Sequence, residues 1–155
     1  MKYEVVVLEE KTVAGISART NNGDANMQAV IGGLWGSFFE KGIYAGINNK
    51  INEKALGIYT DYSGDEKGDY TVMVACEVAA KTEQDSENEN IIFGKIPAGK
   101  YAKFIVKGDM VKAVAECWQK IWEMDLPRAF VCDFEEYQNE SMDEAEIHIY
   151  ISLKE

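Results

Sequence analysis

The residues whose types and spacing best suggest chemistry are two successive glutamates, Glu135 and Glu136. They lie in the segment 133–137, which reads Asp-Phe-Glu-Glu-Tyr. Because side chains alternate along a strand, Glu135 and Tyr137 would share one sheet face and Glu136 would point to the other. A carboxylate that shares a face with apolar groups has a raised pKa or needs a cationic partner. The first property serves general acid–base catalysis and the second serves binding of a cation, whereas solvated glutamates on an edge strand would serve neither.

Aromatic residues are the second group that could form a site. Small-molecule pockets are commonly lined by aromatic side chains with few polar groups, and ring faces attract organic cations. Buried Trp and Tyr also need a partner for their polar atom, so three tryptophans in one small core favour a cleft. Core packing is the alternative for each ring taken alone. Together with Glu135, the residues that we predict to contact a ligand are Tyr137, Tyr59, Trp122, Trp118, Trp35, Phe104 and Tyr150.

Residue counts and spacing disfavour other kinds of site. His148 is the only histidine, which argues against His-rich metal sites and against a Ser-His or Cys-His mechanism. Cys76, Cys117 and Cys132 are widely spaced in apolar stretches, so we expect buried free thiols rather than disulfides or metal ligands. The chain also lacks the glycine-rich phosphate and dinucleotide motifs and the GxSxG motif. We therefore predict no metal and no cofactor.

The overall charge bears on the choice of partners. The 155 residues carry a formal net charge of −11, from 16 basic and 27 acidic side chains. Phosphate groups are bound largely through Lys and Arg, so this balance argues against nucleic acid and anionic membranes, although an acidic surface can serve solubility alone. No apolar run approaches the roughly 20 residues of a membrane span, and residues 1–5 alternate like a strand rather than a signal peptide. We expect a cytoplasmic protein.

Hydrophobic periodicity predicts the elements that must position these residues. Residues 27–39 carry a wide apolar stripe with helical spacing, and Gly42 suits the position just after a helix end. A second stripe over 111–122 predicts a helix that begins after Asp109 and ends at Leu126-Pro127. Strands are predicted at 3–20 with a bulge or bend at Gly15, 55–62, 69–78, 91–107 with a bend at Pro97 and Gly99, 130–137 and 145–153. The segment 43–54 is predicted to be irregular.

The two predicted helices share a motif, which indicates an internal duplication. Residues 34–40 and 117–123 both read apolar-Trp-x-x-apolar-aromatic-Glu, and each helix is followed by a two-strand pattern. One such unit is too small to bury a good core alone, so the halves should share one. We predict a single α+β domain of two pseudo-twofold β-α-β-β units, 1–80 and 91–155, joined by an acidic linker at 81–90. Both helices would lie on one face of an antiparallel sheet.

Several segments together resemble the GyrI-like, or AraC-type effector-binding, superfamily, which supplies the ligand-binding domain of multidrug-sensing regulators. The resemblance spans essentially the whole chain and is carried by the segments 34–38, 57–62, 68–78, 96–102, 118–122, 133–137 and 149–151. It implies tandem SHS2-like modules with a ligand cleft between the halves, where bulky, often cationic or aromatic compounds bind. It also implies that the cleft glutamate of the family's Phe-Glu-x-Tyr motif is Glu135, with Tyr59, Trp122 and Tyr137 as aromatic lining.

Three functions are compatible with this resemblance. We expect first a stand-alone module, without the helix-turn-helix domain of the regulators, that senses or sequesters a hydrophobic, cationic or aromatic small molecule beside Glu135. The alternative is an enzyme, since some stand-alone relatives hydrolyse cyclopropane-bearing electrophilic toxins, and Glu135 with Tyr137 could activate a water and donate a proton. The third is a modulator that binds DNA gyrase, as other relatives do.

Overall fold

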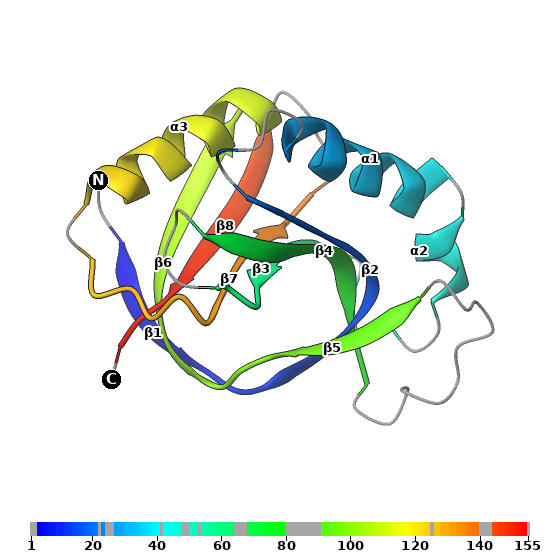
Figure 1. Cartoon of the computed structure of the whole chain (residues 1–155), viewed down its shortest axis with the longest axis horizontal. Helices are drawn as coiled ribbons and strands as arrows, with labels where there is room; N and C mark the ends of the chain where they lie inside the picture. Colours follow the sequence, from blue (N-terminus) through cyan, green and yellow to red (C-terminus); the bar gives the residue numbers. More distant parts are fainter. Residues whose placement is uncertain are drawn as a thin grey trace.

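Each half of the chain has two strands, then a long helix, then two more strands, and the two strands before each helix replace the single bent strand that the sequence predicted (Figure 1). The computed structural model describes residues 3–21, 23, 27–40, 42–47, 50–52, 54–63, 68–79, 91–124, 126–139 and 144–154. Its elements in chain order are β1 (Glu4–Leu8), β2 (Lys11–Asn21), α1 (Met27–Glu40), α2 (Ile43–Gly46), β3 (Ala55–Thr60), β4 (Asp69–Val78), β5 (Ile92–Ile96), β6 (Gly99–Gly108), α3 (Met110–Glu123), β7 (Cys132–Tyr137) and β8 (Ala145–Ser152). The α+β fold is confirmed, and the predicted linker at 81–90 lies outside the described residues.

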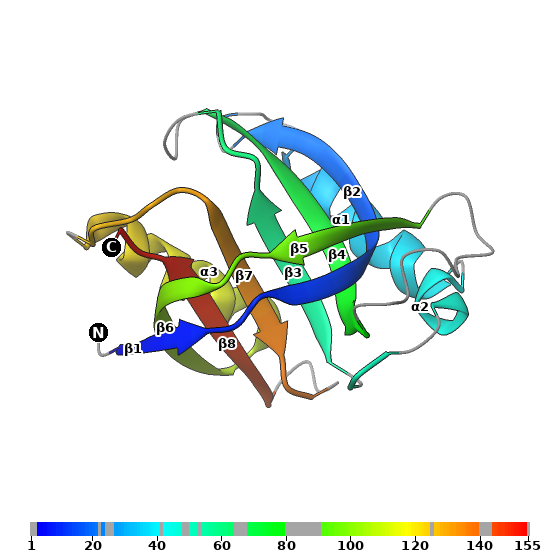
Figure 2. The same cartoon turned by 90° about the horizontal axis from the view of Figure 1, so that it is seen from below.

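One antiparallel sheet holds the eight strands in the order β1-β6-β8-β7-β3-β4-β2-β5. β1 and β2 follow one another along the chain, as do β5 and β6. The chain bends between β1 and β2 and again between β5 and β6. β1 pairs with β6 and β2 pairs with β5 in the same register on either side of these bends, so the sheet folds back on itself (Figure 2). Exchanging each strand of the first half with its counterpart in the second half (β1 with β5, β2 with β6, β3 with β7 and β4 with β8) gives the same strand order read backwards. The halves are therefore related by a pseudo-twofold axis between β3 and β7.

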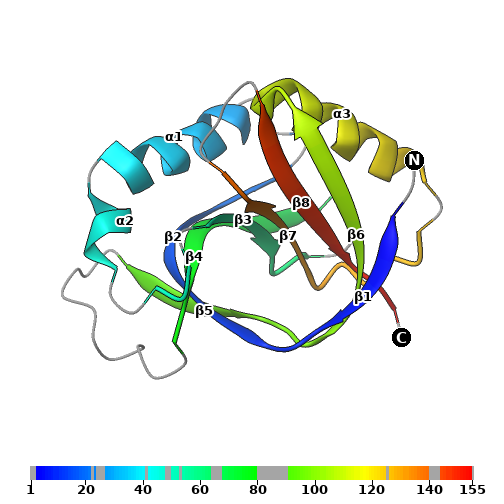
Figure 3. The ribbon, with the colours of Figure 1, turned by 180° about the vertical axis from the view of Figure 1, so that it is seen from behind.

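The helices α1 and α3 cover the same face of the sheet, as predicted (Figures 1 and 3). Phe38 of α1 is fully buried in a cluster with residues of β2 and β4, and Ile121 of α3 is fully buried in a cluster with residues of β6 and β8. A third cluster, which includes Phe134 of β7, joins the central strands to the bent strands on the other side. The alternation predicted for the strands therefore assigns one set of side chains to the helices and the other to the folded-back sheet.

Local sequence explains where α3 begins and where α1 ends. The side chain of Asp109 is the N-cap of α3: it accepts a 2.8 Å hydrogen bond from the backbone N–H of Lys112 in the first turn. Just beyond α1, Gly42 has a φ of +72°, which glycine adopts without strain. α3 ends at Glu123 and not at the predicted Leu126-Pro127, because Met124 already has an extended backbone.

Two other predictions about the backbone need correction. Gly15 does not mark a bulge, because it lies within β2 in uninterrupted register with β4 and β5, and the strand breaks between β1 and β2 instead. Glycine is needed there for a different reason: a Cβ at this position would lie 1.9 Å from the carbonyl oxygen of Val74 on β4. The segment 43–54 is not irregular throughout, since it contains α2. The ammonium group of Lys50 stabilises the end of that short helix by donating to the carbonyl oxygens of Tyr44 in the helix and of Ile47 just after it.

The cysteine prediction is confirmed, since Cys76, Cys117 and Cys132 are buried free thiols. Burial raises the pKa of Cys76 and Cys117 to about 11 and that of Cys132 to about 12, which keeps all three protonated near neutral pH. In the part of the chain that the structure describes, no helix is both long enough and apolar enough to span a membrane.

Candidate functional site

The carboxylate of Glu135 lies near the centre of the sheet, on the face covered by the helices. Glu135 is only 3% exposed, and both of its oxygens accept hydrogen bonds. Oε2 accepts from the indole Nε1 of Trp118 at 2.6 Å and from the hydroxyl of Tyr59 at 3.2 Å. Oε1 accepts from the hydroxyl of Tyr137 at 2.8 Å. Three donors from α3, β3 and β7 thus converge on one buried carboxylate.

All of these donors are neutral, which sets the electrostatics of the site. Burial raises the pKa of Glu135, and the hydrogen bonds from Trp118, Tyr137 and Tyr59 oppose that rise without cancelling it. Burial and the neighbouring carboxylate raise the pKa of Tyr59 and Tyr137 well above the usual value, so both phenols stay protonated. For the same reasons the pKa of Tyr70 rises to about 12. Among the described residues, Glu135 has no ion pair.

Aromatic rings surround the carboxylate. Trp118 packs edge-on against Tyr59, with ring centroids 5.5 Å apart, and Tyr59 packs in the same way against Tyr70 at 5.7 Å. On the other side, Trp35 of α1 packs edge-on against Tyr137 at 5.0 Å. Four of the residues predicted from the sequence, together with Glu135, therefore meet in one place. We call Glu135, Tyr59, Tyr137, Trp118 and Trp35 the carboxylate cluster.

The three remaining predicted contacts lie elsewhere. Trp122 is 47% exposed on α3 and reaches the cluster only through Trp118, at a ring distance of 6.4 Å. Phe104 is fully buried in the core beneath α3, two strands away from β7. Tyr150 lies on the opposite face of the sheet, where it stacks on Phe134 at 4.6 Å. Periodicity marked these rings as inward-facing but did not show which of the sheet's two faces and which core they would join.

Gly57 is a residue of the candidate site that was not predicted from the sequence. Gly57 lies directly opposite Glu135 in the β3–β7 ladder. A Cβ at this position would lie 3.2 Å from Oε1 of Glu135 and 3.2 Å from Cζ2 of Trp35, which is tighter than an ordinary contact. The missing side chain therefore makes room for both groups. A glycine within an otherwise apolar strand was the available signal, since such a glycine often marks a close approach.

A second buried carboxylate lies two residues away on the same strand. Asp133 is fully buried, and its Oδ2 lies 2.8 Å from Nη2 of Arg128 and 2.6 Å from the hydroxyl of Tyr62. Its Oδ1 accepts from the backbone N–H of Ser152 at 2.8 Å and from the side-chain hydroxyl of Ser152 at 3.1 Å. We call Asp133, Arg128, Tyr62 and Ser152 the arginine cluster. No local pattern in the sequence pairs Arg128 with this aspartate.

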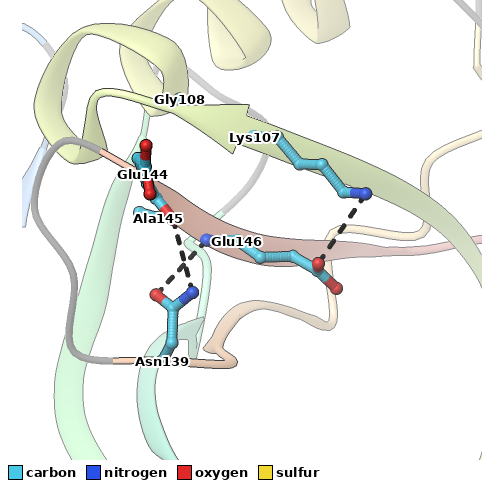
Figure 4. Close-up of a pocket in the computed structure, with 6 residues that line it drawn as sticks. All are labelled: Lys107, Gly108, Asn139, Glu144, Ala145 and Glu146. Atoms are coloured by element: carbon cyan, nitrogen blue, oxygen red, sulfur yellow. Dashed lines mark hydrogen bonds and ion pairs between the residues drawn. The ribbon is translucent and has the colours of Figure 1, made fainter.

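A shallow hollow of about 390 Å³ lies away from the carboxylate cluster, at one end of β6 and β8 (Figure 4). Its polar groups bind one another: Asn139 bonds to Glu144 and Glu146, and Lys107 lies 3.8 Å from a carboxylate oxygen of Glu146. The hollow is lined by Lys107, Gly108, Asn139, Glu144, Ala145 and Glu146. None of the predicted site residues lines it, and the ligand cleft beside Glu135 stays a prediction.

Metal binding has no support in the described part of the chain, where no three His, Cys, Asp or Glu side chains gather closely enough to hold an ion. The carboxylate cluster itself contributes a single acidic residue. Its arrangement can hold a positive charge against Glu135 and offer ring faces and edges to the rest of a ligand.

Comparison with protein families gives a match that covers almost the whole chain. The family model, Cass2, is described as integron-associated effector binding protein and matches residues 4–153. None of the curated proteins compared with the chain matches it.

Solved structures share the fold over nearly the full length. An integron cassette protein from the mobile metagenome of Vibrio cholerae has a TM-score of 0.78 and 26% identity, and the match covers 98% of this chain and 95% of that one. A putative bacterial transcription regulation protein from Staphylococcus aureus has a TM-score of 0.76 and 22% identity, with coverage of 100% and 99%. SAV2435, in a structure bound to tetraphenylphosphonium, has a TM-score of 0.76 and 21% identity, with coverage of 99% and 94%.

Proposed function

The chain belongs to the family of integron-associated effector binding proteins, and from this premise we propose that it binds a hydrophobic, cationic small molecule beside Glu135. The GyrI-like resemblance predicted from the sequence is confirmed at the level of family and fold. An effector-binding role is general to the family. The cationic nature of the ligand and its contacts are what we propose for this chain.

The observation that carries the proposal is a buried carboxylate with neutral partners. A buried charge is costly unless it is paired, and the three donors to Glu135 supply hydrogen bonds but no positive charge. A cationic ligand would supply the missing charge, and the rings of Trp35 and Trp118 would cover its apolar parts. The structure of SAV2435 bound to tetraphenylphosphonium, a bulky aromatic cation, supports this choice of ligand class.

The hydrogen bonds of Glu135 favour binding over catalysis. A general base needs a carboxylate lone pair directed at the water that it activates. Oε2 of Glu135 already accepts two hydrogen bonds and Oε1 accepts one, so about three of the four lone-pair positions of the carboxylate are taken and only Oε1 has one left for a water. Hydrolysis by Glu135 and Tyr137 remains the second candidate, because the 2.8 Å contact between them is a suitable distance for proton transfer. Release of product from a cyclopropane-bearing electrophile would distinguish hydrolysis from binding.

The test compares two neighbouring glutamates that face opposite sides of the sheet. Tetraphenylphosphonium binding is measured by calorimetry for the wild type, Glu135→Gln and Glu136→Gln. Loss of one partner of a buried charge pair costs about 2 kcal/mol or more, so Glu135→Gln should bind roughly thirtyfold more weakly or worse. Glu136→Gln is the matched control and should bind like the wild type, since Glu136 lies beside Lys54 away from the cluster. Equal affinity of Glu135→Gln and wild type would reject the proposal.

A further inference from the structure

The carboxylate cluster has two nearly identical aromatic walls. The ring centroids of Trp118 and Tyr59 are 5.5 Å apart at an interplanar angle of 75°, and those of Trp35 and Tyr137 are 5.0 Å apart at 71°. Each wall contains the tryptophan of one half of the chain and the tyrosine of the other half. Both walls are therefore made in the same way from both β-α-β-β units.

The strand register shows that this likeness follows the pseudo-twofold axis. Gly57 and Glu135 are directly opposite in the β3–β7 ladder. An exchange of this pair, followed through the registers of the other strands, carries β1 onto β5 and the first residue of β2 onto that of β6, so the pseudo-twofold axis passes between these two residues. Tyr59 and Tyr137 each lie two residues further along their own strands, so they exchange as well. Trp35 and Trp118 are both the ninth residue of a 14-residue helix. The two walls are thus equivalent positions of the duplicated unit.

The charge is the one part of the site that is not duplicated. The partner of Glu135 under the exchange is Gly57, which has no side chain; a Cβ there would lie 3.2 Å from both Oε1 of Glu135 and Cζ2 of Trp35, so the space is tight even for a methyl group. The carboxylate contacts both walls: it accepts from Trp118 and Tyr59 on one side and from Tyr137 on the other. One negative charge therefore lies between two equivalent aromatic walls.

From this geometry we infer that the preferred ligand carries one positive charge at its centre with an aromatic arm on each side. The inference rests on the proposed function and narrows its ligand class. With the charge against Glu135, a ligand of this shape reaches both walls at once, and each ring contact adds favourable energy. A cation with its charge at one end has only one arm to place, so it reaches one wall and leaves the other without a partner.

Two isomeric probes separate charge position from size and composition. Dibenzyldimethylammonium has its charge between two benzyl groups, whereas (4-phenylbenzyl)trimethylammonium has the same atoms and charge with both rings on one side. Calorimetry with the wild type should give about tenfold tighter binding of the central isomer, which corresponds to one additional wall contact. Equal affinities, or tighter binding of the terminal isomer, would overturn the inference.

Trp35 provides the test within the protein, because it forms one wall without a hydrogen bond to Glu135 in the described contacts. Trp35→Leu should weaken the central isomer about tenfold and the terminal isomer about twofold or less, since a single arm can use the Trp118 wall instead. Trp35→Phe keeps a ring and should restore most of the preference for the central isomer. Equal losses of both isomers in Trp35→Leu would also overturn the inference, and thermal unfolding checks that each variant folds.

The outcomes distinguish this inference from the proposed function. If both isomers bind in a Glu135-dependent way with equal affinity, the inference fails and the proposed function stands. If the isomers and tetraphenylphosphonium all fail to bind the wild type, the proposed function fails and the inference fails with it.

Discussion

Asp133 and Glu135 are buried carboxylates two residues apart on β7, and they differ in their partners. Asp133 faces a guanidinium group, a phenol and both donors of a serine, whereas Glu135 faces an indole and two phenols. The difference is a single positive charge. It shows that burial of a carboxylate does not by itself mark a binding site, because the partners decide whether its charge is already balanced.

The arginine cluster, unlike the carboxylate cluster, connects the segment before β7 to the last strand of the sheet. Asp133 binds Ser152 at the end of β8, and the backbone N–H of Ala129 donates to the carbonyl oxygen of Ser152 at 2.9 Å. Arg128 also stacks on the ring of Phe130 at 4.3 Å. Asp133 therefore ties the segment before β7 to the last strand of the sheet. Glu135 has no such ion pair among the described residues, which is why we propose this carboxylate as the one that binds the ligand.

The largest expected effect comes from removing the positive charge of the arginine cluster. Arg128→Met leaves Asp133 buried without its ion-pair partner, which should lower the free energy of unfolding by about 3–5 kcal/mol. Urea denaturation measures the loss. The double variant Arg128→Met/Asp133→Asn should recover part of it, because the uncompensated charge is then gone. A loss under about 1 kcal/mol in the single variant would mean that the pairing does not stabilise the fold.

Neutralising each carboxylate should change stability in opposite directions. Asp133→Asn should destabilise the protein, because it removes the ion pair and turns an acceptor into a donor. Glu135→Gln should stabilise the ligand-free protein at neutral pH, by about 1.4 kcal/mol for each unit by which burial raises the pKa of Glu135. The amide can still accept from Trp118 and donate to the hydroxyl of Tyr137. Urea denaturation of both variants at pH 7 gives the comparison, and a destabilised Glu135→Gln would contradict it.

The pH dependence of the Glu135 effect follows from the direction of its pKa shift. The folded pKa lies above the unfolded value, so the folded state holds the proton more tightly, and wild-type stability falls as pH rises through the interval between the two values. Glu135→Gln lacks this proton, so its advantage should be small near pH 4 and grow as pH rises. The affinity of the wild type for a cation should fall on acidification through the same interval, because protonation removes the charge that binds it. The first expectation would be wrong if the free energies of unfolding of wild type and variant changed in parallel with pH. The second would be wrong if the affinity of the wild type for the cation stayed constant over the same interval.

The smallest expected difference concerns two phenols in matching roles. Tyr62 donates to Asp133 at 2.6 Å and Tyr59 donates to Glu135 at 3.2 Å. Tyr62→Phe should cost about 1.5 kcal/mol, because a short bond to the carboxylate of an ion pair is lost. Tyr59→Phe should cost about 0.5 kcal/mol or less, since its bond is long and Trp118 still donates to the same oxygen. Both substitutions keep the ring and remove only the hydroxyl, so thermal unfolding of the two variants compares the two hydrogen bonds. Equal losses of stability would mean that the two phenol–carboxylate hydrogen bonds contribute equally.

The sequence allowed a large part of the fold and the centre of the site to be predicted. Helical periodicity located α1 and α3, and alternation along β7 assigned Glu135 and Tyr137 to one face. The resemblance then marked Glu135 as the central acid. Phe104 and Tyr150 were predicted as contacts only because they are inward-facing rings, and the structure places them in two other cores. Gly57 and Arg128 were missed because their roles depend on neighbours that are distant in the chain.

What the sequence determined by itself is the local part of this protein: the elements, their duplication, and the face of each strand that carries a given side chain. These follow from the 3.6-residue and 2-residue periods, which are properties of short segments. The tertiary structure decided which segments meet. Only the antiparallel register of β3 and β7 sets Gly57 opposite Glu135, and only the packing of both helices on one face brings Trp35 and Trp118 to either side of that carboxylate. Register and packing are long-range pairings, so they decide which buried acid already has a positive partner and which one does not.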